Sequence, residues 1–294
     1  MDTVVRYDEE GNIISSDTIG KNDGIKYVKP PKEESKTYKK IKESNNKMNN
    51  LTEELGGFYF MIYYENNKLF DGRIDEKHIC RLIYLATFLV YDSNKLVERQ
   101  GRNNVALTEK DIKEKLGLDK KTYKTFKDDV VGKGIVSFED DGIHLSTDYF
   151  IKGKAPHKCS FSRVYVKTVR QLYEQVQPRQ HKTLSYFFKL LPYCDYEYNV
   201  ITSCPDTDEA MEHRMTREDI AELLEMDFNA FKKLEKALEN LQVDLFGETY
   251  CVMGSVTVKC GGKKRMFYVV NPLIFNSGNE FDKLHNVWTQ MLKM

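Results

Sequence analysis

The chain has 294 residues, and its 45 lysines and arginines equal its 45 aspartates and glutamates, so the formal net charge is zero. A chain of this length typically holds about two domains, each large enough for its own apolar core. Zero net charge excludes a polycation that binds nucleic acid through bulk charge alone, so the placement of the charges becomes the relevant question.

The sequence shows no sign of export or of a membrane span. Residues 1–6 lack the apolar segment of a signal peptide. The longest apolar runs, residues 58–64 and 82–91, are shorter than the roughly 20 residues that cross a bilayer. The six cysteines form no Cys-x-x-Cys pair, which is typical of free thiols, although a bond between Cys251 and Cys260 is an alternative. We therefore expect a cytoplasmic protein with no membrane partner.

Residues 1–55 are polar and predict a flexible N-terminal arm. Residues 4–7 and 13–14 flank Gly11-Asn12, which favours a small hairpin. Residues 26–47 contain eight lysines and three glutamates, and Pro30-Pro31 interrupts any regular element there. Two interpretations stay open for this arm, a solvated linker or a segment that follows a phosphate backbone.

Residues 56–153 predict a first domain with two short consecutive helices. A strand at residues 58–64 and an apolar helix from Asp75 to Tyr91 come first. Thr108 is a suitable N-cap for the next helix, and Gly117 is typical of its end. Asp119 can cap a second helix, and a hairpin turning at Asp141-Gly142 follows. Two helices joined by a glycine turn and followed by a hairpin form a helix-turn-helix with a wing. The inner face of the second helix comprises Tyr123, Phe126 and Val130.

The same pattern recurs in residues 154–278 at an ungapped shift of 108 residues. A second hairpin is expected from strands at 250–260 and 266–270, with its tip at residues 261–265. We therefore expect an α+β fold with two tandem winged helix-turn-helix domains. Residues 279–294 predict an amphipathic helix that either caps its own domain or pairs with a partner chain. The identical pairs are Thr108–Thr216, Asp111–Asp219, Ile112–Ile220, Glu114–Glu222, Leu116–Leu224 and Asp119–Asp227.

Three features together resemble a known group of proteins. They are the run from Arg81 to Ala86, the tandem helix-turn-helix units, and the exit from Tyr268 to Pro272. Over roughly residues 58–278 the chain resembles the tandem winged-helix proteins of bacterial plasmids and phages, which include replication initiators and transcription regulators. The resemblance implies sequence-specific binding of double-stranded DNA, with replication or transcription proteins as partners. It leaves the choice between regulator and initiator open, because a fold alone does not define a function.

The candidate DNA-binding residues lie on the two second helices and on the second wing. Thr122 and Asn229 are candidates for base edges, and the lysines mostly for phosphates. The first wing tip, residues 139–141, is acidic, so we expect the first unit to read DNA with its helix and the second to add wing contacts. The candidates are Lys120, Lys121, Thr122, Lys124, Thr125 and Lys127, then Asn229, Lys232, Lys233 and Lys236, and finally Lys263, Lys264 and Arg265.

Motifs of catalysis are missing from the sequence. It has no Gly-x-x-x-x-Gly-Lys-Ser/Thr loop, and His157-Lys158-Cys159 has no second ligand pair at zinc-finger spacing. We therefore expect no enzyme, no cofactor and no metal. Two rival functions stay open, a protein-interaction scaffold that uses the acidic stretch before Thr216, and a DNA-nicking enzyme with a tyrosine nucleophile. The sequence does not decide between a monomer and a homodimer, nor the symmetry of the DNA site.

Overall fold

The computed structural model divides the chain into two compact units, residues 1–51 and residues 52–294. In the first unit, β1 (Asp2–Tyr7) pairs antiparallel with β2 (Ile13–Ile19), in agreement with the predicted hairpin. The rest of the predicted arm up to residue 49 and the helix predicted at 279–294 lie outside the described residues. The structure describes residues 2–7, 13–19, 50, 52–63, 69–100, 103–154, 160–205, 207, 209–210, 212–260 and 263–276.

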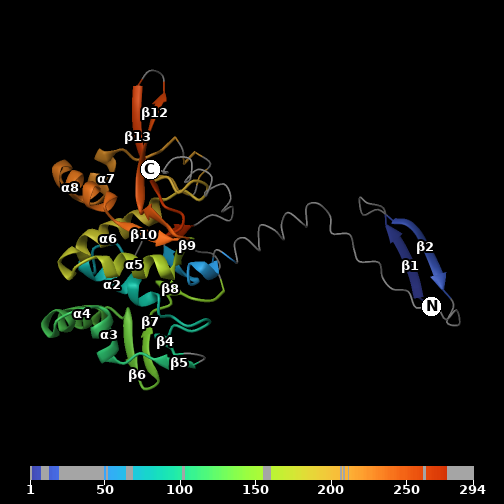
Figure 1. Ribbon diagram of the computed structural model, residues 1–294, viewed down its shortest axis with the longest axis horizontal. Coiled ribbons are helices and arrows are strands. Elements are labelled where there is room, and N and C mark those ends of the chain that lie inside the picture. The colour runs from blue at the N-terminus through green and yellow to red at the C-terminus, as the bar shows by residue number, and fades with distance from the viewer. Residues whose placement is uncertain are drawn as a thin grey trace. The chain divides into compact units, whose positions relative to one another are not determined.

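The second unit is an α+β structure of helices and small antiparallel sheets (Figure 1). Its central sheet has four antiparallel strands in the order β14, β9, β3, β8. Four successive side chains of β3, residues 59–62, are buried. Because side chains alternate along a strand, both faces of this sheet are covered, which explains the continuous apolar run in the sequence. The four strands are β3 (Phe58–Tyr63), β8 (Phe150–Ile151), β9 (Ser160–Tyr165) and β14 (Phe275–Asn276).

Residues 58–151, which we call the first repeat, contain the predicted pair of short helices. Thr108 and Asp111 form a capping box at the first of them, and Asp119 accepts hydrogen bonds from two backbone N–H groups of the second. The preceding apolar helix ends at Ala86 rather than at Tyr91, because Leu89 forms a β-bridge with Leu96. Between β3 and β8 the elements are α2 (Glu76–Ala86), β4 (Val97–Gln100), β5 (Asn103–Ala106), α3 (Glu109–Lys115), α4 (Lys120–Gly132), β6 (Val136–Glu139) and β7 (Gly142–Leu145).

Residues 160–276, the second repeat, contain one hairpin that the sequence analysis missed. We predicted Tyr250 and Cys251 at the start of the strand 250–260 of the second hairpin, but they belong to this extra hairpin. Its turn is Phe246-Gly247, both in the left-handed region with φ of 55° and 78°, and phenylalanine is not a turn signal. Between β9 and β14 the elements are α5 (Val166–Gln175), α6 (His181–Leu190), α7 (Arg217–Leu223), α8 (Phe228–Glu239), β10 (Gln242–Leu245), β11 (Glu248–Cys251), β12 (Met253–Cys260) and β13 (Lys263–Val270), with 3-10 turns at Pro178–Gln180 and Leu191–Tyr193.

Corresponding backbone hydrogen bonds identify the equivalent parts of the two repeats. In each repeat, the segment after the long apolar helix exchanges hydrogen bonds with the second strand of a hairpin, which is β7 in the first repeat and β13 in the second. The hairpin that corresponds to β6–β7 is therefore β12–β13, and β10–β11 is an insertion between α8 and this hairpin. We call β6–β7 the first wing and β12–β13 the second wing, after the predicted wings. Leu96 N donates to Ile143 O in the first repeat, and Ile201 N donates to Tyr268 O in the second. Likewise, Leu145 N donates to Asn94 O in the first repeat, and Val270 N donates to Asn199 O in the second.

The central sheet relates the two repeats by a local two-fold axis. Its inner strands, β3 and β9, are antiparallel neighbours, with Phe60 opposite Arg163 and Met61 opposite Ser162. Each is the first strand of its repeat, and each pairs on its outer side with the last strand of the same repeat, β8 or β14. A half-turn about an axis between β3 and β9 therefore exchanges the sheet strands of the two repeats.

The two repeats also share one core, because α2 packs against α6. Cys80 N donates a 3.0 Å hydrogen bond to Ser185 Oγ, and Arg81 Nε donates one of 3.0 Å to His181 Nδ1. Residues 52–294 form one compact unit, which contains both predicted domains. Among the described helices, none combines the length and the apolar character that crossing a membrane requires.

Candidate nucleic-acid interface

Helix α4 buries one side and leaves a cationic side exposed. Tyr123, Phe126 and Val130 are buried, as the spacing of three and four residues predicts. The opposite face carries the exposed side chains of residues 120, 121, 124 and 125. Because Asp119 caps the helix, the N-terminal turn that holds these lysines is well ordered at its start.

Not all six candidate residues on α4 are equally available to a ligand. Lys120, Lys121 and Lys124 form no ion pair with any residue that the structure describes. Lys127, in contrast, pairs with Glu109 at 2.8 Å and lies 4.4 Å above the ring of Phe138.

The two hydroxyl candidates are also engaged. Thr122 Oγ1 donates to Asp119 at 2.6 Å, and Thr125 Oγ1 donates to the backbone oxygen of Lys121 at 3.2 Å. Lys120, Lys121 and Lys124 are therefore the cations of α4 that remain available.

Helix α8 presents a more basic face than the sequence indicates. In the sequence, Glu235 and Glu239 stand among its lysines, but Glu235 is buried and hydrogen-bonded on the inner side of the helix. The exposed face carries Asn229, Lys232, Lys233 and Lys236, with Glu239 at the C-terminal end. Lys232 lies 4.4 Å from the ring of Phe228.

The inward position of Glu235 ties the helix to its neighbours. Its Oε1 accepts hydrogen bonds from Arg217 Nη2 at 2.9 Å and from the Tyr268 hydroxyl at 2.5 Å. Burial, and then the hydrogen bond to Glu235, raise the pKa of Tyr268, and the same carboxylate raises the pKa of Arg217. Since these residues come from α7, α8 and β13, the network fixes the second helix against its wing.

The first wing is acidic, and some of its carboxylates have partners within the protein. His144 Nε2 lies 2.8 Å from Asp141, Lys95 Nζ lies 3.3 Å from the same carboxylate, and Ser137 donates to Glu139 at 2.7 Å. The hydrogen bond with His144, and then that with Lys95, lower the pKa of Asp141. Glu139, Asp141 and His144 bring ligand atoms within 4.8 Å of one another, but each has a partner in the protein, so we assign no metal to them.

The second wing is longer and carries the remaining candidates. Its strands have eight residues each, against four in the first wing, and the hairpin projects from the body (Figure 1). We predicted residues 263–265 at the wing tip, but they lie within β13, where Lys264 is opposite Lys259. Lys259 thus joins the group, and only the strand register could identify it. Side chains of residues 258–265 lie outside the described part.

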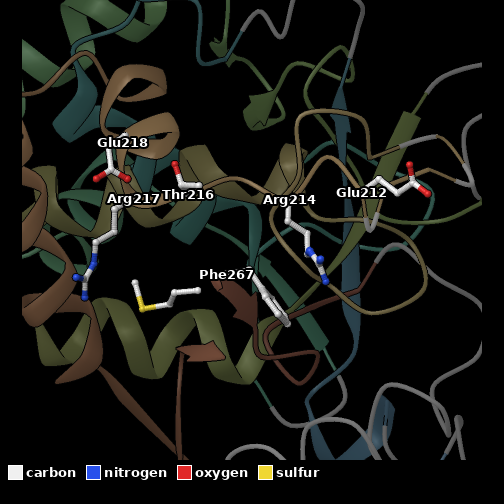
Figure 2. A pocket seen from close by; sticks show the side chains of 7 residues that line it. Glu212, Arg214, Thr216, Arg217, Glu218 and Phe267 are labelled. Carbon is white, nitrogen blue, oxygen red and sulfur yellow. The ribbon is translucent and has the colours of Figure 1, made fainter. Parts of the chain in front are cut away.

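A hollow of about 310 Å³ lies between the start of α7 and β13 (Figure 2). The guanidinium of Arg214 lies 4.9 Å from the ring of Phe267, and Arg217 is already paired with Glu235. Two glutamates balance the two arginines, so we assign no anionic ligand to this hollow. The lining residues are Glu212, Arg214, Thr216, Arg217, Glu218, Met266 and Phe267.

Comparisons of this chain with protein-family models, with curated proteins and with solved structures gave no match. A functional assignment therefore depends on the exposed cationic helices and on the wings described above.

Proposed function

We propose that the protein binds double-stranded DNA in a sequence-specific manner through two winged helix-turn-helix units, without a catalytic step. One observation carries this proposal. Helices α4 and α8 both start at an aspartate cap, both bury one apolar stripe, and both expose lysines along the opposite side. In helix-turn-helix proteins this is the helix that enters the major groove, with its N-terminal residues at the base edges.

The exposed residues divide into two roles by their chemistry. Lysines neutralise phosphates and set the affinity, whereas residues in the first turn read the bases. Asn229 can pair with the two hydrogen-bonding groups of adenine, and Lys121, which occupies the equivalent position in α4, favours guanine. The second wing, through Lys259 and residues 263–265, adds contacts to phosphate or to the minor groove.

The biological role is either transcription regulation or initiation of DNA replication. The resemblance to plasmid and phage proteins supports both, with transcription or replication proteins as the corresponding partners. A promoter-reporter fusion and an origin-dependence assay, each with the chain supplied and withheld, distinguish the two roles.

The proposal is tested by selecting binding sites from a random duplex library, followed by gel shifts. We expect the library to yield an enriched sequence. The variant Lys120→Ala/Lys124→Ala should bind that sequence at least about tenfold more weakly, which is on the order of one lost contact pair. Lys167→Ala/Lys182→Ala is the matched control, because it removes two lysines that pair with Glu54 and Glu76 instead. If no sequence is enriched, a scaffold that binds other proteins becomes the better interpretation.

Two of the described tyrosines are poorly suited to act as the nucleophile of a nicking enzyme. A tyrosine nucleophile requires an accessible hydroxyl that loses its proton readily. Burial raises the pKa of Tyr165 to about 12, and burial together with Glu248 raises the pKa of Tyr250 to about 12. Incubation with supercoiled DNA tests the nicking enzyme as a rival function, and we expect the DNA to stay unnicked.

A further inference from the structure

We infer that the DNA target consists of two half-sites in inverted orientation and of unequal sequence, which a single chain reads together. This inference rests on the proposed function, because it specifies how the two units share one duplex. It follows from the local two-fold axis, which the 108-residue sequence repeat by itself does not reveal: a repeat in sequence is compatible with either direct or inverted placement in space.

The axis is supported by two separate layers of the structure. In the sheet, the antiparallel register of β3 and β9 makes each repeat the image of the other, down to the flanking strands β8 and β14. In the helical layer, α2 and α6 are equivalent helices that pack directly against each other, joined by the bond from Cys80 to Ser185. Equivalent elements that meet across a common axis are the property of a two-fold, isologous contact.

The helices that carry the exposed lysines each contact the apolar helix of their own repeat. In the first repeat, His78 of α2 lies 2.9 Å from Asp129 of α4 and meets the ring of Phe126 edge-on. In the second repeat, α6 also packs against α8. Figure 1 shows the result: the two wings point in opposite directions, and α4 and α8 lie at the same edge of the molecule.

A duplex has its own two-fold axes, perpendicular to its length. When protein units related by a two-fold axis bind one duplex, the two axes coincide, and the half-sites are inverted. The equivalent outward residues of α4 and α8 differ, so the half-sites differ in sequence and the target is not a palindrome. The differing pairs in the first two turns are Lys120 with Phe228, Lys121 with Asn229, Thr122 with Ala230, and Thr125 with Lys233.

The experiment makes the two helices alike. The variant Phe228→Lys/Asn229→Lys/Ala230→Thr/Lys233→Thr gives the first two turns of α8 the outward residues of α4, since Lys232 already matches Lys124. Sites are then selected from a random duplex library with the full-length variant, whose folding is checked by its melting transition. We expect a palindrome, bound about tenfold or more tightly than a direct repeat of the same half-site, because a misoriented half leaves one helix on mismatched base pairs.

A second measurement does not depend on that variant, because each protein it uses differs from the natural sequence at a single position. A photo-crosslinking amino acid replaces Lys121 in one protein and Asn229 in another, on the site selected with the unmodified chain. Inverted half-sites place the two crosslinks on opposite strands at positions related by the dyad. Crosslinks on the same strand, or selection of a direct repeat by the helix-matched variant, overturn the inference while the proposed function stands. Failure of the unmodified chain to enrich any duplex overturns both.

Discussion

Arg81 Nε donates a 3.0 Å hydrogen bond to His181 Nδ1, and this bond joins the first repeat to the second. Both side chains are only 1% exposed, and His181 also lies 4.7 Å from the ring of Tyr173. Because Nδ1 accepts the hydrogen bond, the imidazole must be neutral in the folded chain. The contact is therefore sensitive to acid.

The first prediction concerns this sensitivity. Burial, and then the charge of Arg81, lower the pKa of His181 from 6.5 to about 4. A histidine with a depressed pKa in the folded state binds its proton mainly when unfolded, so the stability is complete above pH 6.5 and falls as the pH drops toward 4. We expect a loss of roughly 2 kcal/mol between pH 7 and pH 5 from this group.

Urea unfolding at the two pH values measures that loss. His181→Gln is the control, because its side-chain oxygen can still accept from Arg81 but does not titrate. The loss between pH 7 and pH 5 should shrink by roughly the same 2 kcal/mol in this variant. An equal pH dependence in both proteins would contradict the assignment to His181.

The second prediction concerns the turns between the paired helices. Gly117 has φ of 61°, and Glu225, at the equivalent position of the second repeat, has φ of 54°. The left-handed region costs a residue with a Cβ on the order of 1 kcal/mol. We therefore expect Gly117→Ala to destabilise the protein by about 1 kcal/mol and Glu225→Gly to stabilise it by up to about the same amount.

Thermal unfolding of the two variants checks these opposite signs. A Cβ at Gly117 meets nothing within 4 Å, so steric overlap does not contribute. Gly132→Ala serves as control, since Gly132 is in α4, has no positive φ and also has open space around it. It should be neutral or slightly stabilising. Destabilisation by Glu225→Gly would show that this turn is not strained.

The third prediction concerns the network that fixes α8. Arg217 is partly exposed, but Glu235 is buried, with 7% of its side chain accessible. Removing the arginine leaves a buried carboxylate whose remaining partner among the described residues is Tyr268, whereas removing the carboxylate leaves a cation that water can solvate. We expect Arg217→Met to cost about 2 kcal/mol and Glu235→Gln about 1 kcal/mol.

A double-mutant cycle with these two substitutions measures the coupling. The double variant should be more stable than the sum of the single losses implies, by roughly 0.5–2 kcal/mol. Strict additivity would mean that the ion pair contributes no coupling energy.

The fourth prediction concerns the salt dependence of DNA binding. Each lysine–phosphate contact contributes about 0.9 to the slope of log affinity against log salt. Lys120→Ala/Lys124→Ala should therefore flatten the slope by nearly two units. Lys127→Ala should change it little, because Lys127 is paired with Glu109.

Fluorescence anisotropy titrations over a series of salt concentrations measure the slopes. An unchanged slope in the double variant would remove α4 from the interface. If Lys127→Ala changed the slope by as much as each lysine of the double variant does, the ion pair between Lys127 and Glu109 would have to open when DNA binds.

Local signals in the sequence identified the elements that matter most for the proposed site. Thr108 and Asp119 cap α3 and α4 as expected, and Thr216 and Asp227 do the same for α7 and α8. These signals can be read directly because a cap or an apolar stripe involves residues only a few positions apart. The internal repeat was visible for the same reason, since it preserves caps and inner faces.

Features that depend on distant residues could not be read in this way. Phe246-Gly247 forms a tight turn without a typical turn sequence, and Glu235 looks like a surface acid until Arg217 and Tyr268 are seen beside it.

By itself, the sequence determined where the paired helices of each repeat begin and which side of α4 and α8 is apolar, because those properties follow from neighbouring residues. Only the tertiary structure decided that the two repeats share one core and face each other across a two-fold axis. That relation arises from the pairing of β3 with β9 and the packing of α2 on α6. Both contacts join segments about a hundred residues apart, and no local pattern specifies their direction.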